Sequence, residues 1–283
     1  MENFDQKSYW DHTASQKWIQ EYDSIKFRLK EVTEHFFKFL PKLDNLKILD
    51  VGCGTGETLL YLSKLIEEKS KITAIDISQS MIEFAKNKLS GQSNFHQYDF
   101  IVDDAQTHIF NKNHYDLLIS RFGMMFFSDP LGAFKNLYHS LNIGGEIHFC
   151  TWSGIRENDF FGIPLITLSN FLNISIPDLN NQPGPMSLSE PKLIRSLLEN
   201  TGFNNIKINT QKVNLRGLEN LDQQLFILLN IGPAGRLFKE YKLDKDKKKI
   251  SILKKQLKKN LKYRIYKDEL VLTANVHFIH GKK

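Results

Sequence analysis

Three glycines at alternate positions, Gly52, Gly54 and Gly56, form the most informative motif of the sequence. They follow the apolar run 47–51 and precede an apolar pattern with helical spacing, so they connect a predicted strand to a predicted helix. Glycine permits a sharp turn there and leaves no Cβ in the way of a ligand. A tight turn without a ligand is the alternative. The neighbouring residues are needed to distinguish a ligand-binding loop from such a turn.

Two acidic residues follow at positions where a bound nucleoside needs them. Asp76 ends the next predicted strand, 20 residues after Gly56, where a carboxylate can accept hydrogen bonds from two ribose hydroxyls. Asp99 is expected at the end of the third predicted strand, within reach of an adenine amino group. Together with the glycines, these carboxylates predict a cofactor that contains adenosine.

The spacing of the glycines distinguishes between two such cofactors. Dinucleotide-binding folds carry G-x-G-x-x-G and rest a pyrophosphate on the start of the helix. Here the motif is G-C-G-T-G, and Glu57 follows in the first turn of the predicted helix. A carboxylate at that position would repel a pyrophosphate but tolerate a zwitterionic amino-acid group, which favours S-adenosylmethionine over NAD.

The segment 48–56 resembles the first motif of the class I S-adenosylmethionine-dependent methyltransferases. Four further segments resemble the second to fifth motifs of that family: 74–78 with Met81, 97–100, 115–120 and 141–146. The resemblance covers residues 10–213 and the final strand. More loosely, 120–130 resembles small-molecule methyltransferases close to the ubiquinone and menaquinone C-methyltransferases, without fixing a substrate. The implied product is S-adenosylhomocysteine.

The resemblance implies a role for residues from each of these motifs. Asp50 would orient the glycine loop and help to hold the amino group of the cofactor, and Asp76 would bind the ribose. Ile77 and Met81 would lie on the two faces of the adenine. The full set of predicted cofactor-binding residues is Trp10, Asp50, Gly52, Cys53, Gly54, Gly56, Asp76, Ile77, Met81, Asp99, Phe100, Ser120 and Arg121.

Three of these residues, Ser120, Arg121 and Trp10, are expected near the reacting end of the cofactor or over it. Ser120 and Arg121 would lie near the methionine tail and the transferred methyl group, although Arg121 could instead pair with a surface acid. Trp10 is the predicted lid over the cofactor, because it lies outside the apolar stripe that places Trp18 in the core.

No sequence feature marks a catalytic residue. In-line methyl transfer mainly requires that the reacting atoms are aligned and that water is excluded. A general base is needed only for a hydroxyl or an acidic carbon. His12, Tyr22 and Arg121 are the candidates, with an inert role as the alternative for the first two. The two cysteines and nine histidines show no Cys/His pair at ligand spacing, so no metal site is expected, and His148 is predicted to be a core histidine.

The elements that must position these residues alternate between strand and helix. Such a pattern predicts an α/β fold whose parallel sheet binds ligands beyond the carboxyl ends of its strands. The expected fold is a Rossmann-like, seven-stranded, mostly parallel sheet with an antiparallel last strand, helices on both faces and helical cap insertions. The predicted strands are 47–51, 71–77, 95–98, 115–120, 146–152, 205–213 and 269–279.

Four segments are expected along the chain. An N-terminal helical lid (1–45) precedes the cofactor-binding core (46–152), a cap insertion (153–189) and the rest of the core (190–283), which contains a helical insertion at 218–262. The cap and the insertion are rich in apolar residues, including Phe160, Phe161 and the run 225–229. An apolar roof suits a small, partly apolar methyl acceptor.

The basic charge of the chain is concentrated in one segment. The net charge is +6, and residues 239–262 contain eleven lysines against three acids. Their apolar residues follow helical steps, which predicts an amphipathic helix with a basic outer face. This face is either merely solvated or in contact with an anionic surface or acidic partner. Nucleic acid would also require aromatic residues on that face.

Other classes of protein remain as alternatives or are excluded. An RNA or protein methyltransferase that uses the basic helix, and a non-catalytic S-adenosylmethionine-binding protein, are the two rival functions. No apolar run reaches the length of a transmembrane helix, and the first residues do not form a secretory signal. A cytoplasmic protein is therefore expected. The sequence does not indicate an oligomeric state.

Overall fold

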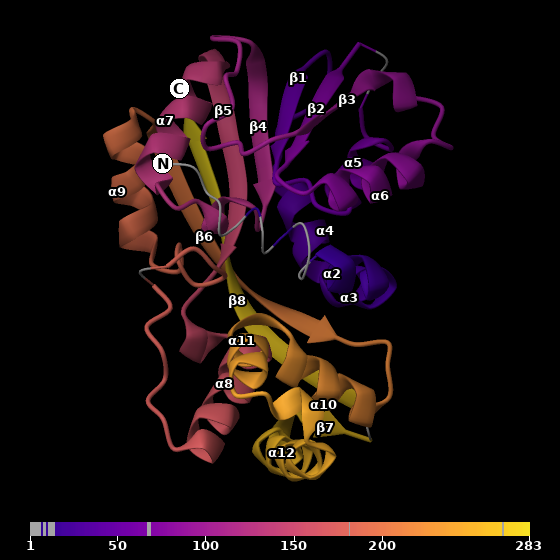
Figure 1. Cartoon of the computed structure of the whole chain (residues 1–283). Helices are drawn as coiled ribbons and strands as arrows, with labels where there is room; N and C mark the ends of the chain where they lie inside the picture. The colour runs from indigo at the N-terminus through magenta and orange to yellow at the C-terminus, as the bar shows by residue number, and fades with distance from the viewer. Residues whose placement is uncertain (1–6, 8–9, 11–14, 67–68, 181, 268) are drawn as a thin grey trace.

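A mixed sheet forms the framework of the computed structural model, which describes all residues except 1–6, 8–9, 11–14, 67–68, 181 and 268 (Figure 1). Its strand order is β3-β2-β1-β4-β5-β8-β6, and a short strand, β7, pairs separately with β8. The strands are β1 (Lys47–Val51), β2 (Lys71–Asp76), β3 (Tyr98–Val102), β4 (Tyr115–Arg121), β5 (Leu141–Trp152), β6 (Asn204–Arg216), β7 (Ile265–Tyr266) and β8 (Glu269–Lys282).

The direction of the strands agrees with the sequence analysis. β3, β2, β1, β4 and β5 are parallel neighbours, whereas β8 runs antiparallel to β5 and β6. The central strand β4 carries the run Leu117–Ile119, which is buried on both faces, as is typical of a parallel sheet covered by helices. The predicted mostly parallel sheet with an antiparallel last strand is confirmed.

Helices cover both faces of the sheet. Phe149 of β5 contacts Phe134 of α7 (Pro130–Ser140), and α9 (Pro191–Thr201) packs on the same side against α7. Phe278 of β8 points to the other face, where it stacks on Phe39 at the end of α4 (Lys30–Lys38). The remaining helices around the core are α2 (Ser15–Gln20), α3 (Tyr22–Arg28), α5 (Glu57–Leu62) and α6 (Gln79–Leu89).

Several predicted boundaries were wrong. The single helix expected at 14–40 is divided into α2, α3 and α4 by the non-helical residues Glu21 and Leu29. The segment 95–97 forms a 3₁₀ turn instead of a strand, so β3 begins and ends later than expected. This shift moves the carboxyl end of β3 to Val102 and changes which acid lies there.

A second lobe of helices lies beyond the carboxyl ends of the parallel strands (Figure 1). It consists of α8 (Asp159–Leu172), α10 (Leu221–Asn230), α11 (Gly232–Glu240) and α12 (Lys247–Asn260). α8, from the first insertion, packs against the three helices of the second insertion. The two insertions of the sequence therefore share one apolar core.

The lysine-rich segment is not one helix, contrary to the prediction. α11 ends at Glu240, a 3₁₀ turn follows, and Asp246 begins α12 by accepting a hydrogen bond from the Lys249 amide at 3.0 Å. The predicted inward face is confirmed, because Leu253 and Leu257 are fully buried. Among the residues that the structure describes, no helix is long and apolar enough to span a bilayer.

Candidate functional site

A pocket opens at the carboxyl ends of the parallel strands, where the α/β pattern predicts a ligand. Its walls include Val51 from β1, Asp76 from β2, Asp103 after β3, Arg121 from β4 and Trp152 from β5. Five successive elements of the sheet thus contribute to the same cavity, and aromatic residues from the N-terminal helices and from α8 close its other side.

The glycine loop forms the floor of this pocket. Gly54 has φ +55°, and a Cβ on it would meet no atom within 4 Å, so the backbone here borders open space that a ligand can approach closely. Gly56 has another role: a Cβ there would lie 2.8 Å from the Cβ of Ala85, and Gly56 does not line the pocket. Its missing side chain allows α5 and α6 to pack.

Asp76 is held in a fixed orientation by two backbone amides. Gly54 donates to its Oδ2 at 2.8 Å, and Ser78, which caps α6, donates to its Oδ1 at 2.9 Å. An ionised carboxylate has further lone pairs that can accept hydrogen bonds from a ligand. Ile77 and Met81 line the pocket beside it. This arrangement fits the ribose and adenine of an adenosyl cofactor.

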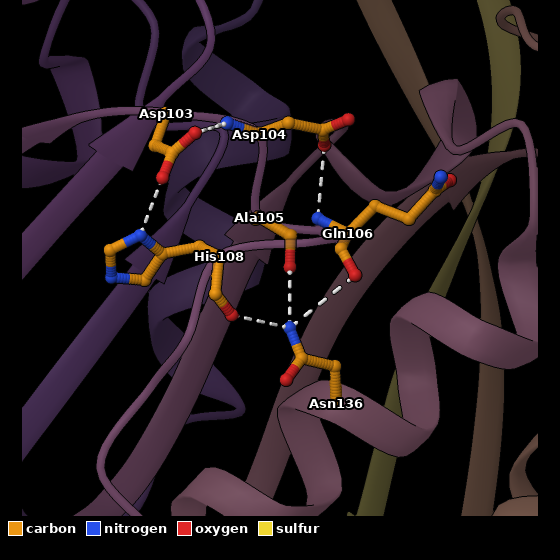
Figure 2. Close-up of polar contacts among 6 residues, drawn as sticks. All are labelled: Asp103, Asp104, Ala105, Gln106, His108 and Asn136. Atoms are coloured by element: carbon orange, nitrogen blue, oxygen red, sulfur yellow. Dashed lines mark hydrogen bonds and ion pairs between the residues drawn. The ribbon is translucent and has the colours of Figure 1, made fainter. Parts of the chain in front are cut away.

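The loop after β3 contributes two more acids, Asp103 and Asp104, to the lining of the pocket. Figure 2 shows the polar contacts that hold this loop. Asn136 of α7 fixes this loop by donating to the carbonyl oxygens of Ala105 (3.1 Å), Gln106 (3.4 Å) and His108 (2.9 Å). Nδ1 of His108 also lies 2.7 Å from a carboxylate oxygen of Asp103. The loop is therefore anchored by α7 as well as by the strand that precedes it.

Asp104 has a carboxylate oxygen that is available for a ligand. Its Oδ1 accepts a hydrogen bond from the Gln106 amide at 2.9 Å, whereas its Oδ2 is buried and has no partner among the described residues. Burial also raises the pKa of Asp104. A buried acceptor without a partner is costly, and a donor group on a bound molecule would satisfy it.

Asp99 and Phe100, predicted to bind the adenine, do not reach the pocket. Asp99 is exposed and pairs with Thr73 in the interior of β2, away from the carboxyl end of the sheet. The ring of Phe100 contacts those of Phe95 and Tyr98. The placement was wrong because β3 extends through the apolar residues 100–102, and that run, followed by two acids, was the signal for the true strand end.

Asp50 and Ser120 were also predicted to touch the cofactor, but they act behind the pocket wall. Asp50 is fully buried and accepts a hydrogen bond from the hydroxyl of Thr58, a residue that does line the pocket. Burial raises the pKa of Asp50 to about 7. Ser120 donates its hydroxyl to the carbonyl of Val51 at 2.7 Å. Both side chains hold β1 and its loop in position.

The remaining predicted cofactor residues line the pocket. This placement is compatible with their predicted roles, although contact with a cofactor remains a prediction. They are Trp10, Gly52, Cys53, Gly54, Asp76, Ile77, Met81 and Arg121. Thr55, Thr58, Asp103, Asp104 and Ala105 line it as well and were not predicted from the sequence.

Arg121 supplies a positive charge to the pocket at the end of β4. Its Nε and Nη1 atoms are buried, and neither has a hydrogen-bond partner among the described residues. None of the ion pairs among the described residues involves Arg121, so the structure does not show the alternative in which it pairs with a surface acid. A guanidinium in this position can bind a carboxylate or another anion.

Neither of the other catalytic candidates is placed at the pocket by the structure. The Tyr22 hydroxyl donates to Glu57 Oε2 at 2.8 Å, and burial together with this hydrogen bond raises the pKa of Tyr22. Glu57 is itself buried and does not line the pocket, so the predicted repulsion of a pyrophosphate by Glu57 loses its basis. His12 lies outside the described residues.

Aromatic side chains form the roof. Phe122, at φ +65°, stacks on Trp152 at 4.2 Å, and Trp152 meets Phe161 of α8 edge to face at 5.6 Å. Trp10 contacts Phe126 edge to face at 5.1 Å. Trp18, predicted as core, also lines the pocket, whereas the run 225–229 does not and instead contributes buried leucines to the helical lobe.

Comparisons with known proteins identify the domain that contains the glycine loop. Residues 48–145 match a family described as a methyltransferase domain. The chain contains a class I S-adenosylmethionine-dependent methyltransferase domain. S-adenosylmethionine is the cofactor of this domain, as predicted, and the glycine loop, the oriented Asp76 carboxylate and the unpartnered oxygen of Asp104 fit it.

Two curated relatives of the methyltransferase domain match less than half of the chain. Malonyl-[acyl-carrier protein] O-methyltransferase 1 of Ilyobacter polytropus is 34% identical over 138 residues, 48% of this chain and 48% of the relative. Demethylmenaquinone methyltransferase of Staphylococcus epidermidis is 30% identical over 141 residues, 48% of this chain and 57% of the relative. The matched segment thus spans about half the length of these curated relatives.

A solved structure agrees with the fold over most of the chain. Phosphoethanolamine N-methyltransferase 2 of Haemonchus contortus, in complex with phosphomonomethylethanolamine and S-adenosylhomocysteine, has a TM-score of 0.51 and 18% identity. The match covers 89% of this chain and 52% of that protein. At this identity, the likeness supports the fold and not a substrate.

Proposed function

We propose that the whole protein is an enzyme that transfers a methyl group from S-adenosylmethionine to a small, partly apolar acceptor. The observation that carries this proposal is the division of the pocket into two sides. One side presents the glycine loop and the carboxylates at the ends of β2 and β3, and the other presents aromatic rings from the N-terminal helices, β5 and α8.

On the first side, we assign the parts of the cofactor to particular residues. Asp76 accepts hydrogen bonds from the ribose hydroxyls, Ile77 and Met81 contact the adenine faces, and Asp104 accepts a hydrogen bond from the adenine amino group. Arg121 binds the carboxylate of the methionine tail. Each group is complementary in charge or polarity to the part of the cofactor that it is assigned to.

The bound cofactor supplies a methyl group on a sulfonium, which is already activated for displacement by a nucleophile. The protein then has to hold the acceptor in line with it, and orientation of this kind can contribute about 7–11 kcal/mol. Phe122 and Trp152 exclude water from this side of the pocket, and Trp10 contributes an aromatic face. No residue is assigned the role of a base.

The nature of the roof supports the class of acceptor. Its side chains are mostly aromatic, which suits a molecule with apolar surface. The relatives are named for a demethylmenaquinone and a malonyl-[acyl-carrier protein] substrate. The rival functions as an RNA or protein methyltransferase or as a non-catalytic binding protein are not favoured.

Calorimetry with S-adenosylhomocysteine tests the cofactor side, and Asp76→Ala is the decisive variant. Loss of a charge-assisted acceptor should cost roughly 1.5–3 kcal/mol, or about tenfold or more in affinity. Asp244→Ala, at an exposed position in the helical lobe, is the control and should bind like the parent. Unchanged binding by a folded Asp76→Ala variant would refute the ribose assignment.

We also propose that the lysine-rich segment 239–262 contacts an anionic surface. Ten of its eleven lysines are exposed, and only Lys254 is half-buried, where it lies 2.7 Å from Asp222. Next to the segment, Tyr263 and Tyr266 are 84% and 70% exposed, and amphipathic aromatic residues of this kind are typical of membrane interfaces. An anionic membrane would also be a source of apolar acceptors.

A further inference from the structure

Three possible metal ligands converge on the face of the sheet opposite α7. Glu146 Oε2 lies 3.1 Å from His148 Nε2 and 3.4 Å from His280 Nε2. The ligand atoms of the three residues all lie within 4.8 Å of one another, and the two imidazole rings are 4.5 Å apart. It is the one such group that the described part of the chain contains.

The sheet itself brings these residues together. His148 of β5 and His280 of β8 are directly paired across the antiparallel strands, so their side chains lie on the same face. Glu146 precedes His148 by two residues and shares that face. Ligands on paired strands are held more rigidly than ligands on loops. The sequence analysis missed the group because its histidines are far apart in the chain.

The chemistry of the three side chains suits a metal ion. Divalent metals bind neutral imidazole and ionised carboxylate. The group supplies two imidazole rings and one carboxylate, and the distance of 3.1 Å between His148 Nε2 and Glu146 Oε2 brings a ring nitrogen and a carboxylate oxygen together.

We propose that Glu146, His148 and His280 form a binding site for a divalent transition-metal ion such as Zn²⁺. Two imidazole nitrogens and one carboxylate oxygen are ordinary zinc ligands, and three protein ligands leave a fourth position for water. The side chains of Glu146 and His280 are 28% and 23% exposed, which gives an ion access to the group. Lys282 lies opposite Glu146 in the register of the two strands.

The position of the group indicates a structural role. Glu146 pairs with Leu117 near the start of β4, so the group lies toward the amino ends of the parallel strands, away from the cofactor pocket. β8 runs from the helical lobe to this end of the sheet (Figure 1). An ion here would clamp β8 to β5 and stabilise the folded state by an amount that grows with the logarithm of the free ion concentration.

Titration of the full-length, chelator-treated protein with ZnSO₄ tests the site. We expect one equivalent to bind by calorimetry and to raise the melting temperature, whereas MgCl₂ should do neither because Mg²⁺ requires oxygen ligands. His148→Ala and His280→Ala should each lose this binding. His139→Ala, on α7, where the ring contacts the Lys135 carbonyl, is the matched control and should retain it.

Two outcomes would overturn the proposal: no binding of Zn²⁺ by the parent protein at micromolar concentration, or the same binding by a folded His280→Ala variant. His148 is buried, so its removal could impair folding. His280→Gln is the second variant, because a half-exposed side chain can be replaced with less disturbance. Binding of S-adenosylhomocysteine, measured in parallel, should be unchanged in both His280 variants and shows that each is folded.

Discussion

Asp99 lies within β3 and Asp104 follows that strand, but only Asp104 lines the pocket. Asp104→Asn keeps an oxygen for the Gln106 amide but replaces the unpartnered Oδ2 with a donor, which would oppose an adenine amino group. We expect about a tenfold or greater loss of S-adenosylhomocysteine affinity by calorimetry. Asp99→Asn is the matched control and should bind normally. The reverse ranking would restore Asp99 as the adenine-binding residue.

Asp50 makes the stability of the protein depend on pH. Its pKa is raised by burial from 3.8 to about 7, so the folded state retains a proton that the unfolded chain releases. The stability contributed by this proton is complete below pH 4 and is lost as the pH rises to about 7, by an amount on the order of a few kcal/mol.

Urea unfolding between pH 4 and 8 measures this effect. The Asp50→Asn variant keeps an oxygen for the Thr58 hydroxyl and cannot ionise, so its stability should decline less over this range than that of the parent. Asp244→Asn, at an exposed position, should follow the parent. Parallel curves for the parent and Asp50→Asn would show that Asp50 is ionised throughout.

At the scale of the elements, the sequence predicted best where an apolar run ends at a turn residue. The bounds of β1 and β4 agree with the prediction within a residue. Gly52 directly follows β1, and β4 is a continuous buried run. β3 was misplaced because the aromatic segment 95–98 looks like a strand, while only the three-dimensional structure shows its first three residues in a 3₁₀ turn. That error placed Asp99, and not Asp103 and Asp104, at the carboxyl end of β3.

Contacts between distant elements could not be predicted from the sequence. The register of β5 against β8 pairs His148 with His280, and the hydroxyl of Tyr22, at the start of α3, binds Glu57, which does not line the pocket. Neither arrangement has a local signal, because each depends on how separate elements dock. The pocket-lining residues of the glycine loop were predictable, because the conformation of a short loop depends mainly on its own sequence.

The exposed lysines of α12 are expected to mediate binding to anionic membranes. Replacing Lys247, Lys248, Lys255, Lys258 and Lys259 with Gln removes exposed charges, preserves helix propensity and leaves the Lys254–Asp222 pair intact. Binding to vesicles with anionic lipid should weaken by ~1 kcal/mol for each lysine that contacts the surface. Co-sedimentation at low salt measures this, with neutral vesicles as the control.

The cofactor affinity of this variant separates two placements of the helix. α12 packs its buried leucines against α8 and α10 and does not line the pocket, so S-adenosylhomocysteine should bind with unchanged affinity. If the variant stays folded but loses the cofactor, α12 takes part in closing the active site. Equal sedimentation of variant and parent with anionic vesicles would mean that the basic face is only solvated.

At the scale of the whole molecule, long strands connect the sheet to the helical lobe. Residues of both parts line the pocket. β8 extends along the sheet and into the helical lobe, where β7 pairs with its first residues (Figure 1). Leu215, near the end of β6, and Ile231, at the start of α11, line the pocket together with residues of β1 and β2. A ligand there would contact both lobes and would stabilise the folded chain as a unit.

Thermal unfolding with different nucleotides follows from this arrangement. At 100 times its dissociation constant, a ligand that binds only the folded state adds about 2.7 kcal/mol, which should raise the melting temperature by several degrees. We expect this shift with S-adenosylmethionine and S-adenosylhomocysteine and none with NAD or NADP. The expectation for NAD rests on the G-x-G-x-G spacing, since Glu57 is turned away, and the oriented Asp76 carboxylate would in addition repel the 2′-phosphate of NADP. Asp76→Ala should reduce the shift, and stabilisation by NAD but not by S-adenosylhomocysteine would contradict the assigned cofactor.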